Sequence, residues 1–307
     1  MPRFKNRRTR YRTSRVSKRS SKRKSYGRRK TKKTSRRMST KRILNLTSRK
    51  KRNTMLSWSN TNSNTGVYIA TAPLPLTVNA QTGYRGLWIA TAQDLTDQSS
   101  AYGRVSEMAT RTATSCYMKG LAENIRLQTS SGLPWFWRRI CFTYRGNALR
   151  TFSSLDTPTS TSNRYIDTTS GIQRLSFNEN TNSMSNTINN HDNIIFKGAK
   201  GLDWNDYIVA PVDTSQVNLK YDKVVTLQSG NANGVARNFK RWHAMGHNLQ
   251  YDDDESGDGI QTSQFSVASK VGMGDYYIMD YITGGAAGSA SDLLQFVPTS
   301  TLYWHEK

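Results

Sequence analysis

The side chains of this sequence best suited to chemistry are the lysines and arginines that crowd its N-terminal end. Residues 1–52 hold 25 of the 45 Lys and Arg residues, and no Asp or Glu precedes Asp94. Residues 53–307 carry the other 20 basic residues and all 21 acidic ones, so the net charge of +24 belongs almost entirely to this N-terminal arm. Lys and Arg neutralise phosphates and release counterions, which predicts strong, salt-dependent and sequence-indifferent binding of nucleic acid by the arm.

Contacts to nucleic acid are predicted along most of the arm. Arg outnumbers Lys there, which favours bidentate phosphate contacts, and Tyr11 and Tyr26 can stack on unpaired bases. A solubilising tail is the alternative, but 25 cations without one acid exceed what solubility requires. The residues predicted to contact nucleic acid are Arg3, Lys5, Arg7, Arg8, Arg10, Tyr11, Arg12, Arg15, Lys18, Arg19, Lys22, Arg23, Lys24, Arg28, Arg29, Lys30, Lys32, Lys33, Arg36 and Arg37.

Two basic clusters of the arm are typical of a nuclear import signal, which predicts an import receptor as a partner. The clusters consist of Lys22, Arg23, Lys24, Arg28, Arg29, Lys30, Lys32 and Lys33. The arm has few apolar residues, and burial cannot offset an ordering cost of roughly 1–2 kcal/mol per residue, so we expect it to be disordered until a polyanion binds. We therefore divide the chain into a disordered arm, residues 1–52, and a folded body, residues 53–307.

Motifs for enzymatic chemistry are missing from the sequence. His243 and His247 have an H-x-x-x-H spacing, but the Glu that a zinc protease places between them is absent. In a strand, residues four apart lie roughly 13 Å apart, too far to chelate one ion. The chain has neither a G-x-x-x-x-G-K-[ST] nor a G-x-S-x-G motif, nor the His-hydrophobe-His pair of a replication nuclease. We therefore predict neither enzymatic activity nor a cofactor.

One acidic segment resembles the first half of a calcium-binding loop. Asp252 and Asp254 occupy its first and third positions, Ser256 the fifth and Gly257 the sixth. Position 12 is Ser263, where a bidentate Glu is required. A solvated acidic hairpin tip is therefore the favoured interpretation, and the alternative is a calcium site completed by a neighbouring subunit.

The cysteines and the apolar runs bear on the location of the protein. Cys116 and Cys141 are too few for a disulfide framework, which indicates reduced thiols, packed in the core of a cytosolic or nuclear protein. No apolar run approaches the ~20 residues that span a bilayer, and the basic N-terminus lacks the apolar segment of a secretory signal. We expect no membrane insertion.

The sequence pattern of the folded body predicts short β-rich segments separated by polar loops. Strands are predicted at residues 54–58, 67–71, 86–91, 115–128, 135–144, 172–177, 194–197, 216–227, 236–251, 275–282 and 293–303. Helical periodicity is rare, and one short helix is predicted within residues 200–208. Many strands, few helices and a long chain predict an all-β fold, a single jelly roll of two packed antiparallel sheets.

Four segments of the chain carry a resemblance to a known family. They are ILNLTSRKKRNTML at residues 43–56, KRWHAMGHNLQYDDDE at 240–255, GMGDYYIMD at 272–280 and STLYWHEK at 300–307. In these segments the chain resembles capsid proteins of genomoviruses, small viruses with circular single-stranded DNA genomes, and more distantly geminivirus coat proteins. The resemblance implies a viral jelly roll, a small icosahedral shell, a basic arm facing the genome and assembly in the host nucleus.

The expected function combines the arm with this resemblance. We predict a capsid protein that self-associates into a small shell, of T=1 geometry, packages single-stranded DNA through its arm, and occurs in virions and the host nucleus. The alternative is a non-viral nucleic-acid-binding structural protein of ribosomal or chromatin type. Such a module accounts for the arm but not for a large, nearly neutral and aromatic-rich β body.

Overall fold

The structure, a computed structural model, describes residues 38–162 and 164–307. The predicted nucleic-acid-binding residues and import signal, from Arg3 to Arg37, lie outside the described residues, and so does the predicted disorder of that segment. The chain separates into two units, Met1–Ile43 and Leu44–Lys307, and the second is the folded body. The elements are α1 (Thr40–Thr47), β1 (Arg49–Met55), β2 (Ser57–Thr61), β3 (Tyr68–Ala72), β4 (Leu76–Asn79), β5 (Tyr84–Ile89), β6 (Ser115–Thr129), β7 (Trp135–Tyr144), β8 (Ile166–Thr168), β9 (Gly171–Ser176), η1 (Glu179–Thr181), α2 (Ser185–Ile195), β10 (Asn218–Leu227), β11 (Ala236–Gln250), β12 (Asp254–Ser256), β13 (Gly259–Gln261), β14 (Asp275–Gly284) and β15 (Leu293–Glu306).

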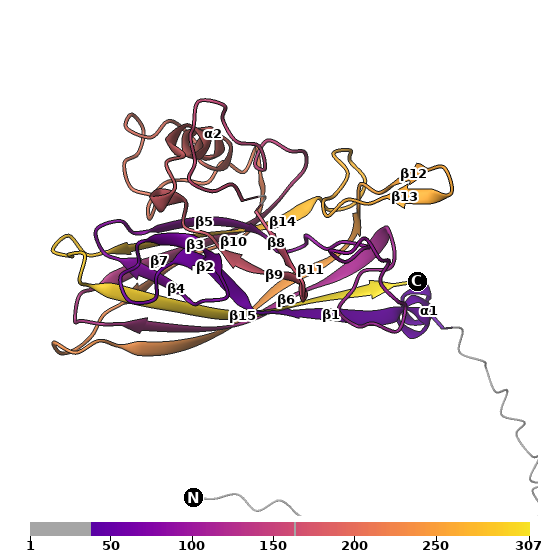
Figure 1. Cartoon of the computed structure of the whole chain (residues 1–307), viewed down its shortest axis with the longest axis horizontal. Helices are drawn as coiled ribbons and strands as arrows, with labels where there is room; N and C mark the ends of the chain where they lie inside the picture. Colours follow the sequence, from indigo (N-terminus) through magenta and orange to yellow (C-terminus); the bar gives the residue numbers. More distant parts are fainter. Residues whose placement is uncertain (1–37, 163) are drawn as a thin grey trace, which may run out of the picture. The chain divides into compact units, whose positions relative to one another are not determined.

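Two antiparallel sheets form the jelly roll of the body (Figure 1). The first, here called the β6 sheet, has the order β1-β15-β6-β11, with β4 also paired to β15. The second, the β7 sheet, has the order β10-β7-β14-β5. Two further sheets accompany them, one of order β3-β2-β9-β8, in which β2 and β9 are parallel, and the β12-β13 hairpin. Strands that follow one another along the chain, such as β6 and β7, β10 and β11, or β14 and β15, lie in opposite sheets. The predicted all-β jelly roll is therefore confirmed.

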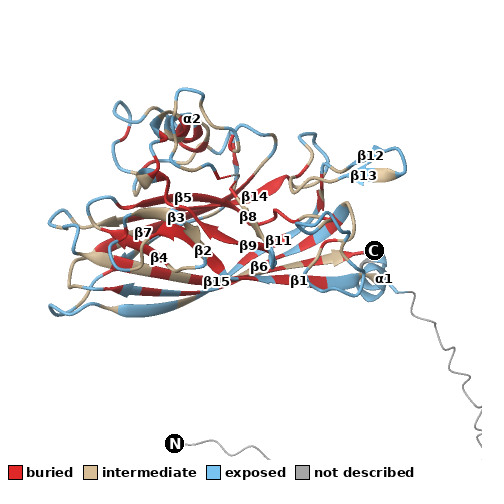
Figure 2. Cartoon of the chain, viewed as in Figure 1, coloured by how far each residue is buried: buried red, intermediate tan, exposed pale blue. Residues whose placement is uncertain are grey.

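The two sheets differ in what covers their outer faces. β6 alternates between buried and exposed residues along most of its length, which is typical of a strand with one packed and one solvated face. β14 is buried on both faces, because α2 and the neighbouring loops pack on the outer side of the β7 sheet (Figure 2). There Phe196 and Tyr207 contact Tyr281 of β14. The β7 sheet is thus covered, and the outer face of the β6 sheet is open.

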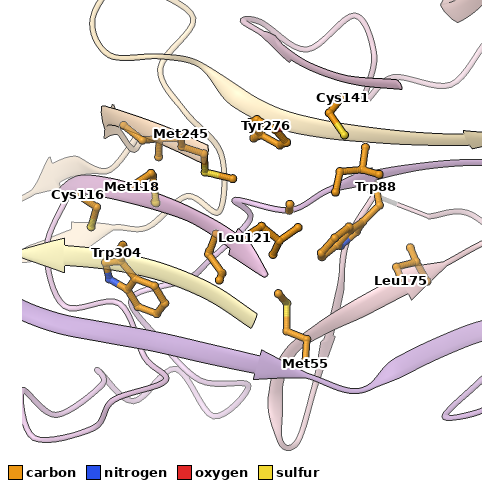
Figure 3. Packing of buried hydrophobic residues seen from close by; sticks show 14 of the residues in the cluster. Met55, Trp88, Cys116, Met118, Leu121, Cys141, Leu175, Met245, Tyr276 and Trp304 are labelled. Atoms are coloured by element: carbon orange, nitrogen blue, oxygen red, sulfur yellow. The ribbon is translucent and has the colours of Figure 1, made fainter. Parts of the chain in front are cut away.

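Apolar side chains of both sheets meet between them (Figure 3). Met118 and Leu121 of β6 belong to the same cluster as Trp88 of β5. Cys116 and Cys141 belong to it as well, and both are buried free thiols, which confirms the prediction that they pack in the core.

Charged side chains also cross the core, in an inter-sheet charge network of Glu123, Arg139, Arg174 and Asp280. Arg139 of β7 donates to both carboxylate oxygens of Asp280 at 2.7 and 2.8 Å, and also to Glu123 of the β6 sheet. Arg174 of β9 donates to Asp280 at 3.3 Å, and its Nε lies 3.6 Å from Glu123. All four side chains are buried. The network holds two positive and two negative charges, so each buried ion has a partner of opposite sign.

The structure corrects the predicted boundary between arm and body. β1 begins at Arg49, so residues 49–52 belong to the β6 sheet and not to a disordered arm. Thr40–Thr47 forms α1. Lys51 is 3 % exposed, and its Nζ lies 3.4 Å from a carboxylate oxygen of Glu306. The prediction was wrong because four consecutive cations were interpreted as part of the arm. In the strand that they form, alternate residues point to opposite sides of the sheet.

Two predicted elements near residue 200 are also wrong. Residues 194–197 are not a strand, because Ile195 ends α2. The helix predicted within residues 200–208 consists of turns. The buried side of α2 includes the polar residues His191 and Asp192. The segment therefore lacks the apolar periodicity from which a helix is predicted.

One buried carboxyl group gives a first testable prediction. Burial raises the pKa of Asp275 to about 6, although the charge of Arg150 opposes this shift. Oδ1 of Asp275 accepts a hydrogen bond from the Ser266 amide at 2.9 Å, whereas Oδ2 accepts none and lies 3.9 Å from Nη1 of Arg150. The unfolded state has the lower pKa, near 3.9, so the folded state loses stability as pH rises from about 4 through 6. Asp275→Asn should therefore raise the free energy of unfolding at pH 7.5 by about 3 kcal/mol and flatten its pH dependence in that window. Urea denaturation at pH 4.5 and 7.5 measures the free energy of unfolding and its pH dependence. An Asn variant with the pH dependence of the wild type would contradict the raised pKa of Asp275.

Candidate nucleic-acid interface

The open face of the β6 sheet carries basic and aromatic side chains in register. Directly paired residues of antiparallel strands point to the same side of a sheet. Tyr303 of β15 pairs with Arg52 of β1, and His305 pairs with Lys50. On the other flank of β15, His305 pairs with Tyr117 of β6. Lys50 and Arg52 are exposed, whereas the intervening Lys51 is buried, so these paired residues point outward.

Further cations extend this face across β6 and β11. Lys119 and Arg126 are exposed on β6, and Lys240 is exposed on β11 opposite Asn124. None of the ion pairs among the described residues involves Lys50, Arg52, Lys119, Arg126 or Lys240. We call these five side chains and the sheet surface between them the cationic face.

The acidic residues of the same strands point the other way. β1, β15, β6 and β11 contain only two, Glu123 and Glu306, and both are buried. Glu123 belongs to the inter-sheet charge network, and Glu306 accepts hydrogen bonds from Thr112 and from the Trp304 indole. The cationic face therefore keeps its full positive charge, which suits it to a polyanion.

Aromatic residues lie within the cationic face. Trp242 of β11 is 54 % exposed, whereas Trp58 is half-buried and the other five tryptophans are buried. The ring centroid of Trp242 lies 5.9 Å from that of Tyr303, at an interplanar angle of 55°. Lys119 Nζ lies 5.7 Å from the ring centroid of Tyr117. Aromatic rings among cations on an open sheet are the components of a single-strand-binding surface.

Gly120 shapes the surface under the indole. A Cβ at residue 120 would lie 2.7 and 3.0 Å from two ring carbons of Trp242 and 2.6 Å from the His243 carbonyl oxygen. Its φ of 152° is also one that L side chains rarely adopt. Glycine thus lets Trp242 of β11 reach across the middle strand toward Tyr303 of β15.

A bulge next to Gly120 separates the two histidines of the H-x-x-x-H spacing. The pairing of β6 passes from Gly120 to Met118, which leaves Lys119 unpaired, and β11 is irregular between Ala244 and His247. As a result His243 is buried and His247 is exposed, whereas a regular strand would place both on one face. Among residues 38–162 and 164–307, no group of three or more His, Cys, Asp or Glu residues is placed to hold a metal ion.

The acidic segment is a hairpin, as the favoured interpretation predicted. β12 and β13 pair around Gly257, whose φ is 65°, and Asp252 and Asp254 are both exposed. Asp253 between them is turned toward Arg111, which donates to its two carboxylate oxygens at 2.6 and 2.9 Å. A calcium site completed by a second subunit stays a prediction. In the described part of the chain, no helix has the length and apolar character needed to cross a membrane.

The cationic face was not predicted from the sequence, because only the net charge of the body was considered and not the side of each strand on which a charge lies. A signal was nevertheless present in the alternation of β6. Glu123 shares its parity with the apolar Ile125 and Leu127, whereas Asn124 and Arg126 fall between them. That alternation assigns the acid to the packed side and the cation to the solvent side.

No family model matches the chain, and no curated protein matches it.

Proposed function

We propose that this protein is a viral capsid protein that builds a small icosahedral shell and packages circular single-stranded DNA. The observation that carries the proposal is a jelly roll with one covered sheet and one open, acid-free cationic face. β1, the edge strand of that open sheet, continues in sequence into the polycationic arm. The resemblance of four sequence segments to genomovirus capsid proteins supports the same function.

Each part of the chain has a task in this proposal. The jelly roll is the structural unit of the shell, with aromatic residues of loops and sheet edges at the subunit contacts. The arm gathers the genome by phosphate neutralisation and carries the nuclear import signal, so that assembly takes place in the host nucleus. The protein acts by binding and self-association and catalyses no reaction.

The charge of the arm sets a scale for the packaged genome. Sixty copies close a shell of T=1 geometry, and residues 1–48 of each copy hold 21 cations. The arms therefore bring about 1,300 positive charges, which balance the phosphates of roughly as many nucleotides. Packaged DNA several-fold longer would show that charge balance does not determine capacity.

Particle formation tests the proposal directly. The expressed full-length chain should sediment as a species of megadalton mass and appear in electron micrographs as closed, uniform particles. These particles should protect single-stranded DNA from nuclease. A matched preparation with the arm cations replaced by Gln should lose the protected DNA.

The competing function is a free nucleic-acid-binding module of ribosomal or chromatin type. It predicts a monomer that binds polynucleotide without forming a shell. A chain that stays monomeric at high concentration, with DNA present, would contradict the capsid proposal and favour the module.

A further inference from the structure

We propose that Trp242 and Tyr303 form a base-stacking site that makes the cationic face selective for single-stranded over double-stranded nucleic acid. The inference deepens the proposed function, on which it rests for the identity of the packaged polymer. Cations alone do not provide this selectivity, because a duplex and a single strand both present phosphates.

The exposure of the two rings is the first argument. Trp242 is 54 % exposed, and Tyr303 is partly exposed beside it. Their planes are inclined at 55°, so each ring presents its own surface and the pair does not stack on itself. A base in a single strand has a free π-face for such a ring, whereas a base in a duplex is already stacked on its neighbours.

The second argument is that the indole is held in place before a ligand arrives. Trp242 lies over Gly120 of the middle strand and contacts Tyr303 on the strand beyond. The bulge at Lys119 lies directly beside this glycine. A ring supported by two neighbouring strands loses little rotamer freedom on binding, so more of the stacking energy appears as affinity.

Cations flank the rings on both sides. Arg52 is the paired neighbour of Tyr303 on β1, and Lys240 precedes Trp242 by two residues on the same side of β11. A strand whose bases stack on the rings would therefore find phosphate partners at either end of the site. Cations interleaved with aromatic rings are the arrangement that binds single strands with little sequence preference.

Charge also argues against a second copy of the chain as the occupant. The outer side of these strands has no acidic residue, so two cationic faces would repel one another. A polyanion is the complementary ligand.

The experiment compares the affinities of the full-length protein for a dT oligonucleotide and for a duplex of matched phosphate number, at fixed salt. Because the arm binds both by charge, the ratio of the two affinities isolates the stacking contribution. Trp242→Leu should weaken single-strand binding on the order of tenfold and leave duplex binding unchanged. Binding of the dT oligonucleotide should also quench the tryptophan fluorescence of the wild type, and this quenching should be largely lost in the variant.

Control variants separate stacking from charge and folding. Trp242→Phe should keep most of the single-strand preference, and Tyr102→Leu, which removes an exposed aromatic ring from a loop, should keep all of it. Lys240→Gln should weaken both ligands alike. An unchanged affinity ratio in Trp242→Leu would overturn the proposal, and a variant that loses self-association with an unchanged ratio would assign the face to contacts between copies.

Particle formation distinguishes failure of this inference from failure of the capsid proposal. If the wild type forms particles and Trp242→Leu keeps the full single-strand preference, the stacking site is wrong and the capsid function stands. If no particles form but Trp242→Leu loses the single-strand preference, the stacking site is supported and the protein is a free nucleic-acid-binding protein.

Discussion

Arg139→Met should lower the free energy of unfolding by about 3–5 kcal/mol, because removing one partner of a buried ion pair leaves uncompensated charge in the core. Arg139 donates to Glu123 and to both oxygens of Asp280, and all three side chains are buried. The methionine is similar in size to the lost side chain, so a cavity adds little to the loss. Chemical denaturation of the nucleic-acid-free protein measures the change.

Arg126→Met is the matched control. It makes the same replacement on an exposed position of β6, and we expect a change within about 0.5 kcal/mol. A loss below about 1 kcal/mol in Arg139→Met would mean that the network relaxes or admits water, and the account of a tightly paired core would be wrong.

The same network predicts sensitivity to acid. Burial by itself raises the pKa of Glu123, but the neighbouring side chains, Arg139 foremost and then His243 and Arg174, together outweigh it and hold that pKa well below the usual range. The unfolded state, with an ordinary Glu pKa near 4.3, then takes up a proton first as pH falls. This contribution to stability is present above that pH and is lost on acidification toward the folded-state pKa. Denaturation midpoints measured between pH 6 and 3 should fall, and by less in Arg139→Met.

Deletion of residues 2–37 should lower the affinity for single-stranded DNA at least a thousandfold at low salt and greatly flatten its salt dependence. The deleted segment holds 19 cations, and for single strands the logarithm of affinity falls with the logarithm of salt with a slope of about −0.7 per neutralised phosphate. Nuclear entry should be lost because the import signal is deleted, and DNA packaging should be lost because the arm cations are deleted. The deletion ends before α1, so the thermal unfolding midpoint of the body should change little.

Two full-length controls accompany the deletion. A scrambled arm of identical composition should bind as the wild type does, because neutralisation depends on charge and not on order. An arm with its Lys and Arg replaced by Gln should behave like the deletion. Retained affinity in the deleted protein would place nucleic-acid binding on the body, and an unfolded deletion variant would make the arm part of the core.

Much of the β architecture was predictable because its signals are local. The predicted strand at residues 135–144 coincides with β7, and the predictions near residues 115–128 and 236–251 miss the bounds of β6 and β11 by one residue each. α2 was missed because its buried side holds His191 and Asp192, whose burial is compensated by tertiary partners. Asp192, for example, accepts a hydrogen bond from Arg85 at 2.7 Å.

The sequence alone established a polycationic arm on a nearly neutral all-β body, since a charge run and a period of two are both visible in consecutive residues. The side of the sheet on which each charge lies required the fold. Glu123 and Arg126 are three residues apart on one strand, yet one neutralises Arg139 inside the core and the other is exposed on the cationic face. The meeting of Trp242 with Tyr303 across Gly120 likewise depends on the pairing of three strands distant in sequence. Strand register and the packing of one sheet on the other are long-range interactions, and they give a nearly neutral body an acid-free basic surface.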